Sequence, residues 1–340
     1  MKSKVMILCG GRSSEHEISC ISAGGILEAI DREKFEPVLV GITKSGAWVV
    51  PADGQSLSIV DGKLPEIKEG SAQSISEILQ ELKPDVIFPI LHGPYGEDGT
   101  VQGLFEIAGI RYVGSGVLAS AVAMDKSFAK PIFAAHGLNV ANGIVVYQRD
   151  WNGSISIGSL KYPLFVKPAR GGSSRGTTKV KSADHLAAAI DEAFAFDTKV
   201  MIEEAIVGRE IECAVLEIDG VATASPLGEI TIDSRFEFYD FEAKYLDGST
   251  SVISPTDLAT QEIQAAAVKA FQALGCEGLA RVDFFYSKEN GLVINEINTM
   301  PGFTSTSVFP KLWSQAGTSY KKLISTLIES ALRRSSSVTR

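Results

Sequence analysis

The chain has 340 residues, of which 45% are hydrophobic and 21% are charged, and its formal net charge is −9. This composition is typical of a folded globular protein, and the length favours two or three packed domains over a single core. The negative charge and the absence of long Lys or Arg runs argue against nucleic acid as a partner. No apolar run reaches the roughly 18 to 20 residues that span a bilayer. Four scattered cysteines without a C-x-x-C pair indicate reduced thiols, and we expect a cytoplasmic protein.

The first third of the chain alternates short β-branched runs with helical patterns. Strands are expected at residues 5–9, 37–42 and 85–90, and helices near 19–30, 75–82 and 100–108. This order predicts βαβ units in a parallel sheet, whose ligand site lies beyond the carboxyl ends of the strands. Two polar loops, 10–17 and 92–99, follow two of those ends.

The middle third begins with one long helical pattern over residues 117–136, followed by strands at 162–167 and 199–204 and a helix at 183–196. The Gly/Ser-rich segment 169–177 lies between them, and its backbone N–H groups would suit phosphate oxygens. A plain surface turn is the alternative, because the segment does not match a Walker A loop. Lys167 favours the anion site, since a charge that ends an apolar strand is costly without a counter-ion.

Strand and turn signals dominate from residue 210, with hairpin turns expected at Asp219-Gly220 and Asn290-Gly291. One helix is expected at 258–274, ending at Gly275. Residues 233–255 show no confident regular element, and a segment of this length in a compact domain is typical of an active-site lid.

The second hairpin carries a polar face. A two-residue type I′ turn at Asn290-Gly291 would place Asp283 opposite Asn298 and Glu296 opposite Phe285. Because side chains alternate, Arg281, Asp283, Glu296 and Asn298 would then project from one face, although a three-residue loop would break this parity. Carboxylate and amide oxygens suit Mg²⁺ or Mn²⁺, and the adjacent Arg281 would clamp a phosphate or an oxyanion. An ordinary solvated hairpin face is the alternative.

Seven sequence segments together resemble the ATP-grasp ligases, and within them the D-alanine–D-alanine ligase family, over nearly the whole chain. They are residues 10–19 (GGRSSEHEIS), 92–100 (HGPYGEDGT), 124–126 (MDK), 166–176 (VKPARGGSSRG), 241–245 (FEAKY), 281–285 (RVDFF) and 296–307 (EINTMPGFTSTS). The resemblance implies an α/β (α+β) ATP-grasp fold with three domains. We expect an N-terminal βαβ domain at 1–121, a central subdomain with the phosphate loop at 122–208, and a C-terminal subdomain with the metal site and lid at 209–340.

The resemblance also implies a role for particular residues. Asp283, Glu296 and Asn298 would hold two Mg²⁺ or Mn²⁺ ions. The ATP-binding set would be Lys126, Lys167, Ser174, Glu203, Ala205, Ile206, Glu210 and Lys244. Glu15 would receive the ammonium of the first substrate, in a hydrogen-bonded triad with Ser173 and Tyr245. Arg281 and the Gly302 N–H would be the oxyanion donors, Ser307 would bind the second substrate's carboxylate, and His92 would approach both substrates.

The implied reaction joins two D-alanines at the expense of ATP, through a D-alanyl phosphate, for peptidoglycan precursor synthesis. A homodimer is common in the family, and dependence on a monovalent cation is left open. Ligases that use D-lactate or D-serine as the second substrate are the main alternatives, and Tyr245 favours D-alanine. A non-catalytic nucleotide-binding protein on the same fold is a further alternative, but it would have no need of Arg281 and Gly302 beside the metal ligands.

Overall fold

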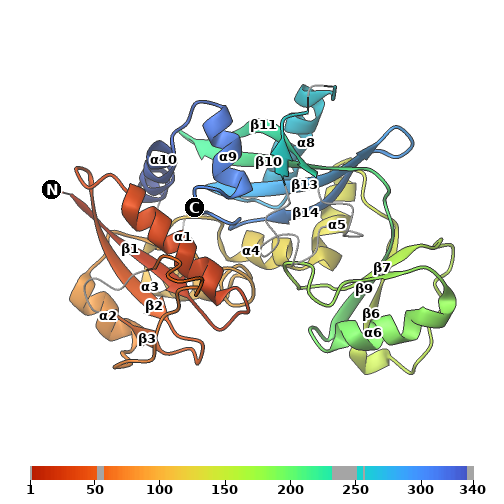
Figure 1. The fold of residues 1–340 in the computed structure, drawn as a ribbon, viewed down its shortest axis with the longest axis horizontal. Coiled ribbons are helices and arrows are strands. Elements are labelled where there is room, and N and C mark those ends of the chain that lie inside the picture. Colours follow the sequence, from red (N-terminus) through yellow and green to blue (C-terminus); the bar gives the residue numbers. More distant parts are fainter. Residues whose placement is uncertain (1, 52–56, 232–250, 256, 335–340) are drawn as a thin grey trace.

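The computed structural model describes residues 2–51, 57–231, 251–255 and 257–334. These residues form three bodies, each built on its own β-sheet (Figure 1). The N-terminal and central bodies lie side by side below the C-terminal sheet in the view of Figure 1, and the helices α4 and α5 run between them under that sheet. Within the described residues, no helix has the length and apolar character needed to cross a bilayer.

The N-terminal body is the parallel βαβ unit that the sequence predicts. Its sheet has the order β3-β2-β1-β4-β5, and all neighbours pair in parallel except β3 with β2. The central strand β1 is buried on both faces, as its apolar sequence indicates. The elements are β1 (Ser3–Gly10), α1 (His16–Ala29), β2 (Phe35–Ile42), β3 (Trp48–Val49), α2 (Ile75–Leu82), β4 (Val86–Pro89), α3 (Thr100–Ala108) and β5 (Arg111–Tyr112).

The single helix expected at 117–136 is in fact two helices, α4 (Val117–Met124) and α5 (Lys126–Ala135). Asp125 separates them because its backbone is extended and its side chain accepts a hydrogen bond from the Ser127 N–H, capping α5. The helical periodicity continues through this break, so the apolar pattern alone does not reveal it. The consequence for the site is that Lys126 is the first residue of a new helix.

The central body has an antiparallel sheet of order β6-β9-β7-β8, covered on one face by a helix. The helix expected at 183–196 divides into a 3₁₀ turn and a shorter α-helix. The elements are β6 (Gly143–Tyr147), η1 (Gln148–Asp150), β7 (Leu164–Pro168), β8 (Thr178–Val180), η2 (Ala183–His185), α6 (Leu186–Phe194) and β9 (Lys199–Glu204).

The C-terminal body has an antiparallel sheet of order β12-β11-β10-β13-β14. One face packs against α8 in the cluster that contains Cys213 and Val282, while Ala214 and Leu216 on the other face pack in the cluster that contains α9 and α10. The elements are β10 (Arg209–Ile218), β11 (Val221–Thr231), β12 (Ser251–Ile253), α8 (Thr260–Ala273), β13 (Leu279–Ser287), β14 (Gly291–Asn298), α9 (Val308–Gln315) and α10 (Tyr320–Arg333).

The two predicted hairpin turns have different outcomes. Asp219 and Gly220 both have positive φ and join Ile218 to Val221 in the expected two-residue loop. At the second hairpin the predicted register is wrong, because Ser287 pairs with Gly291 and the loop therefore has three residues, 288–290. A register shift between residues 283 and 284 compensates for the extra residue.

After this shift, Asp283 lies opposite Glu296 rather than Asn298, and Arg281 lies opposite Asn298. Glu296 is therefore not opposite Phe285, whose partner is Val293. The four polar side chains still share one face, because directly opposite residues of an antiparallel pair point the same way. The predicted partners were wrong, and the shared face survives because the bulge restores the parity that a three-residue loop would otherwise break.

Candidate active site

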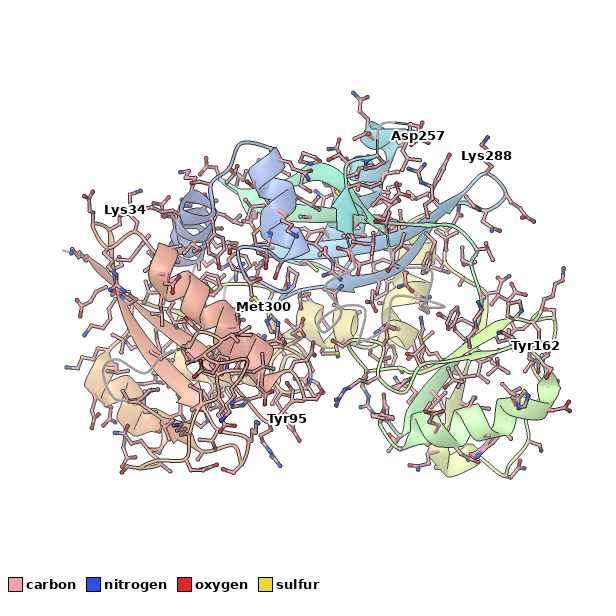
Figure 2. The ribbon with its side chains drawn as sticks, viewed as in Figure 1. Lys34, Tyr95, Tyr162, Asp257, Lys288 and Met300 are labelled. Atoms are coloured by element: carbon pink, nitrogen blue, oxygen red, sulfur yellow. The ribbon has the colours of Figure 1, made fainter. Side chains whose placement is uncertain are left out.

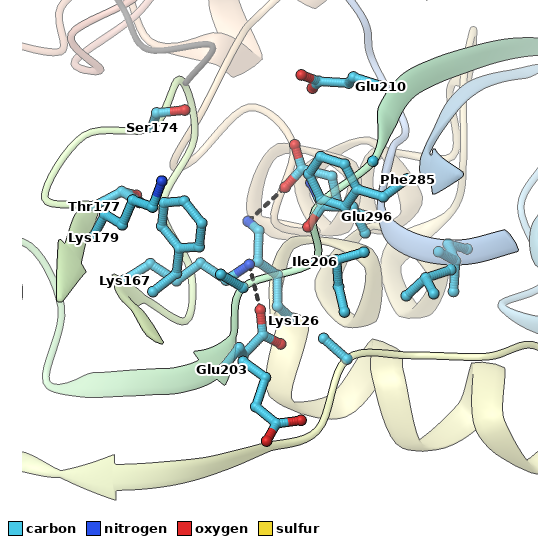
Figure 3. A pocket seen from close by; sticks show the side chains of 18 of the residues that line it. Lys126, Lys167, Ser174, Thr177, Lys179, Glu203, Ile206, Glu210, Phe285 and Glu296 are labelled. Carbon is cyan, nitrogen blue, oxygen red and sulfur yellow. Dashed lines mark ion pairs between the residues drawn. The ribbon is translucent and has the colours of Figure 1, made fainter. Parts of the chain in front are cut away.

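A cavity of about 390 Å³ lies between the central and C-terminal bodies (Figure 3). Its walls come from the Gly/Ser-rich segment 169–177, here called the phosphate loop, and from the end of β9, the beginning of β10, the helix α5 and the strand β14. Nine of the residues predicted for the site line it: Lys126, Lys167, Ser173, Ser174, Glu203, Ala205, Ile206, Glu210 and Glu296. The cavity thus brings together residues that are up to 170 positions apart, Lys126 and Glu296 being the extremes (296 − 126).

Glu203 lies at one end of the cavity between two lysines. Its carboxylate forms ion pairs with Lys167, at 2.6 Å, and with Lys130, and it is almost fully buried. Burial alone would raise the pKa of Glu203, but the two lysine charges and their hydrogen bonds outweigh burial and lower it to about 2. The anion that the charge of Lys167 requires is therefore this carboxylate.

Lys130 was not predicted as a site residue from the sequence, although it lines the cavity beside the predicted residues. Burial lowers its pKa to about 8, against the opposing effect of Glu203. Its position four residues after Lys126 in a helix places both on one face, and this spacing was the available signal. Taken alone, a lysine in an Ala-rich helix is more typical of a solvated surface.

Lys126 connects the phosphate loop to the hairpin. Its Nζ donates to the Gly171 carbonyl oxygen at 2.8 Å and lies 3.1 Å from Oε2 of Glu296. Dashed lines in Figure 3 mark this ion pair and the pair between Lys167 and Glu203. The backbone N–H of Lys126 also donates to the Ala169 carbonyl. The helix break at Asp125 therefore places one ammonium group against both walls of the cavity.

The hairpin face holds a compact charge cluster. Arg281 donates to Asp283 through Nε, at 2.7 Å, and through Nη2, at 2.6 Å, and Asn298 Nδ2 donates to the same carboxylate at 3.0 Å. In the described part of the chain, no group of three or more His, Cys, Asp or Glu side chains is placed to hold a metal ion. The predicted ligand set is instead two carboxylates and one amide, all hard oxygen donors.

The phosphate loop has an uncommon backbone conformation. Ser173 and Ser174 both have positive φ, a conformation that non-glycine residues rarely adopt and that is concentrated at functional sites. Arg170 at the start of the loop is held by Asp197, which accepts from both its backbone N–H and its guanidinium group. The loop is therefore anchored at Arg170, and its two serines line the cavity.

Ser173 also joins the loop to the N-terminal body. Its Oγ donates to Oε1 of Glu15 at 2.6 Å, which brings together the first two members of the predicted triad. The carboxylate of Glu15 lies beside Gly93 and Gly172, and a Cβ on either glycine would come within 3.4 Å of it. Tyr245 and Lys244, with most of the predicted lid at 233–255, lie outside the described residues.

The loop that begins at His92 lies against the segment that contains the predicted oxyanion donor. The His92 ring nitrogen Nδ1 lies 3.1 Å from the carbonyl oxygen of Met300, which Figure 2 places between the N-terminal body and the C-terminal sheet. Gly302 and Ser307 are neighbours in space, since a Cβ on Gly302 would lie 3.2 Å from Oγ of Ser307. Glu97, which the sequence did not single out, accepts from the Gly93 N–H, and burial followed by the charge of Glu15 raises its pKa to about 8.

Comparison with known proteins decides the family. Residues 4–115 match the family model described as the D-ala D-ala ligase N-terminus, and residues 132–329 match the D-ala D-ala ligase C-terminus. The chain belongs to the D-alanine–D-alanine ligase family. It is 47% identical to the D-alanine–D-alanine ligase of Mycolicibacterium gilvum, covering 97% of both chains. It is 46% identical to that of Mycobacterium tuberculosis strain H37Rv, covering 97% of this chain and 96% of the relative.

Solved structures support the same fold. The D-Ala:D-Ser ligase VanG of Enterococcus faecalis matches with a TM-score of 0.78 and 34% identity, over 97% of this chain and 99% of that one. The D-alanine–D-alanine ligase of Bacillus anthracis complexed with ATP matches with a TM-score of 0.76 and 28% identity, over 97% and 98%. The three-domain ATP-grasp fold inferred from the sequence is confirmed, whereas the boundaries at residues 121 and 208 stay a prediction.

Proposed function

We propose that this member of the family joins two D-alanine molecules to D-alanyl-D-alanine with conversion of ATP to ADP and phosphate, for peptidoglycan precursor synthesis. The observation that carries the proposal is the pair of contacts made by Lys126, which places the nucleotide cavity directly against the carboxylates of the hairpin. A site for nucleotide alone would not need that junction. The 46–47% identity to D-alanine–D-alanine ligases over nearly the whole chain supports the same substrate.

The nucleotide end of the cavity is suited to ATP. Glu203 is ionised, so it accepts from the exocyclic amino group of adenine, and the backbone of Ala205 and Ile206 frames the base. Glu210 would bind the ribose hydroxyls, and Lys126, Lys167 and Ser174, which line the same cavity, would bind the phosphates. Lys244 completes the proposed set from outside the described residues.

The hairpin face is suited to divalent cations. Asp283, Glu296 and Asn298 supply only oxygen donors from one face of two paired strands, and with phosphate oxygens they would hold two Mg²⁺ or Mn²⁺ ions. When bound, such ions neutralise charge on the transferring phosphoryl group. The nearby ammonium of Lys126 contributes the same kind of neutralisation from the protein. Dependence on a monovalent cation is part of the same proposal.

The substrate end lies where the three bodies meet. Glu15 receives the ammonium of the first D-alanine, supported by Ser173 and, from outside the described residues, by Tyr245. The carboxylate of this D-alanine takes the γ-phosphoryl group, and ADP leaves. The amine of the second D-alanine attacks the acyl phosphate, phosphate leaves, and the amine loses a proton.

Arg281 and the Gly302 N–H stabilise the oxyanion formed in that attack. Ser307, which adjoins Gly302, would bind the carboxylate of the second D-alanine. His92, whose ring lies against the Met300 carbonyl, would approach both substrates. A closed site is needed because water would hydrolyse the acyl phosphate. We further propose that the protein is a cytoplasmic homodimer.

One assay tests the proposed function. The protein is incubated with ATP, Mg²⁺ and D-alanine, and phosphate release is followed together with the mass of the product. We expect phosphate release that depends on D-alanine and a dipeptide of matching amount. Phosphate release that is independent of D-alanine would reject the ligase reaction. Competition with D-serine or D-lactate tests whether either replaces D-alanine as the second substrate, an alternative suggested by the similarity to the D-Ala:D-Ser ligase VanG.

A further inference from the structure

Glu212 is a buried carboxylate on β10 to which no role has been given so far. Its side chain is 1% exposed. Along β10, Leu216 and Ala214 point from the same face into the apolar cluster with α9 and α10, so the face changes from apolar to acidic at Glu212. Burying a carboxylate at that boundary destabilises the fold unless a partner compensates the charge.

The register of three neighbouring strands places Glu212 in the row of site carboxylates. Glu212 on β10 lies opposite Asp283 on β13, and Asp283 lies opposite Glu296 on β14. Opposite residues of antiparallel strands point to the same face. Glu212 is therefore the innermost member of a row of three carboxylates, and the proposed metal ligands are the other two.

Arg281 is shared between two members of this row. Its Nε lies 3.0 Å from Oε2 of Glu212 and 2.7 Å from Oδ1 of Asp283, while Nη2 is 2.6 Å from Oδ2 of Asp283. The guanidinium group is thus held from β10 by one carboxylate and from its own strand by the other.

The two carboxylates face different demands during the proposed reaction. Asp283 has to direct its oxygens to a metal ion, and its hold on Arg281 weakens when it does so. An arginine side chain that loses its partner regains rotamer freedom, and a misplaced oxyanion donor stabilises the transition state poorly. We propose that Glu212 is a positioning residue that keeps Arg281 aimed at the oxyanion while Asp283 binds metal. This inference rests on the proposed role of Arg281.

A pair of conservative variants separates this role from a third metal ligand. In the structure the single Nε–H of Arg281 is donated to Asp283, and the contact of Nε with Glu212 is an ion pair. Glu212→Gln keeps the length of the side chain and an oxygen that can accept this N–H when Asp283 turns to the metal, but it removes the charge. Glu212→Asp keeps the charge and withdraws the carboxylate by about 1.5 Å, one carbon–carbon bond, beyond hydrogen-bond reach of Nε. Positioning predicts that Glu212→Gln retains most of kcat and that Glu212→Asp loses about 10-fold or more, short of the roughly 10²- to 10³-fold loss on removing a donor. The Mg²⁺ concentration for half-maximal rate should stay unchanged in both.

The opposite order would assign Glu212 to the metal and overturn the proposal. In that case Glu212→Asp would stay active, whereas Glu212→Gln would lose kcat and need a higher Mg²⁺ concentration for half-maximal rate. The matched control is Glu229→Asp on the adjacent strand β11, which shortens a carboxylate that is paired with Arg209 of β10. It should leave kcat unchanged. A second readout does not depend on turnover: the Arg281 Nε–H resonance, assigned by its loss in Arg281→Lys, should shift in Glu212→Asp and much less in Glu212→Gln.

A double-mutant cycle separates failure of this inference from failure of the proposed role of Arg281. If Arg281→Lys retains full activity, Arg281 is not the oxyanion donor. If Arg281→Lys loses activity, Glu212→Asp should add little further loss in that background. Fully additive losses, or loss of ATP binding in Glu212→Asp, would show that Glu212 acts on the fold rather than through Arg281.

Discussion

The buried ion-pair cluster around Glu203 gives a sharp stability prediction for Glu203→Gln. The replacement keeps the shape of the side chain and removes its charge. In the parent protein the Glu203 side chain is 4% exposed and is paired with Lys167 and Lys130, whose side chains are 13% and 6% exposed. The change therefore leaves two lysines beside the cavity without the carboxylate charge that compensates their burial.

The expected magnitude follows from the pKa values. A pKa of Glu203 lowered from 4.5 to about 2 corresponds to roughly 3 kcal/mol of folding stability, at 1.36 kcal/mol for each pKa unit. Since the folded-state pKa is depressed, this stability is present above pH 4.5 and is lost as the pH falls toward 2. Burial lowers the pKa of Lys130 even with Glu203 present, so the Lys130 charge is already destabilised and does not offset the loss of the Glu203 charge. We expect Glu203→Gln to lose about 3 kcal/mol at pH 7, at the lower end for breaking a buried pair.

The assay must report on the central body alone, because a protein of three bodies need not unfold in one step. The chain has three tryptophans, and Trp151 packs against the core cluster of the central body, while Trp48 packs against a cluster of the N-terminal body and Trp313 lies in the cluster that contains α9 and α10. A background with Trp48→Phe and Trp313→Phe leaves Trp151 as the reporter. Its fluorescence during urea unfolding gives the free energy of unfolding of the central body, which is compared with and without Glu203→Gln.

The matched control is Asp150→Asn, which removes the carboxylate of an exposed pair with Arg149. Surface pairs of this kind contribute about 0 to 1 kcal/mol, so the control should barely move the midpoint. Adding Lys130→Met to Glu203→Gln should recover part of the loss, because it removes a buried charge. A loss below about 1 kcal/mol for Glu203→Gln, or no recovery with Lys130→Met, would refute the reasoning.

Three further predictions concern the site. Asp283→Asn should lower kcat more than about 100-fold and raise the Mg²⁺ concentration for half-maximal rate, since a metal contributes several kcal/mol; an unchanged Mg²⁺ titration would remove Asp283 from the ligand set. Ser173→Ala should raise the KM for D-alanine about 10-fold through loss of the 2.6 Å bond to Glu15, and initial rates across D-alanine concentrations would contradict this if KM stayed constant. Because the pKa of Glu97 is raised to about 8, it should reduce stability by a few kcal/mol as the pH rises from 4.5 to 8. Glu97→Gln should reduce the dependence of the free energy of unfolding on pH, measured by urea titrations across this range. An unaltered dependence would argue against a raised pKa of Glu97.

Much of the fold could be predicted from the sequence because its signals are local. The helix at 75–82 has the predicted bounds and begins with a capping box between Ser74 and Glu77. The turn at Asp219-Gly220 needs two positive φ angles, which these residues favour. By contrast, the break at Asp125 leaves the helical period of the apolar residues unchanged. The bulge that pairs Asp283 with Glu296 does leave a trace, because the core residues Ile294 and Ile297 of β14 are three positions apart instead of two. One such step is a weak signal beside the strong turn signal of Asn290-Gly291, which favoured the wrong register.

The missed site residues share one cause. Lys130 and Glu212 are buried and Glu97 is half-buried, and each lies beside a charge contributed by a remote segment. Residues that lie near one another in sequence, such as Arg281 and Asp283, show their proximity through strand periodicity. Glu212 is 69 positions from Arg281 (281 − 212), and only the pairing of β10 with β13 brings the two together.

The charge pattern of the cavity suggests why nucleotide and metal would bind cooperatively. In the structure Lys126 is engaged by Glu296, and Asp283 is engaged by Arg281. A triphosphate that attracts Lys126 would leave the Glu296 carboxylate available to a cation, and a cation at Asp283 would release Arg281 toward the substrate. Each ligand thus removes an internal partner that competes with the other, and such coupling is necessarily reciprocal. Glu212 fits this scheme as the carboxylate that keeps Arg281 in place throughout the exchange, because it belongs to the buried end of the row rather than to the cavity.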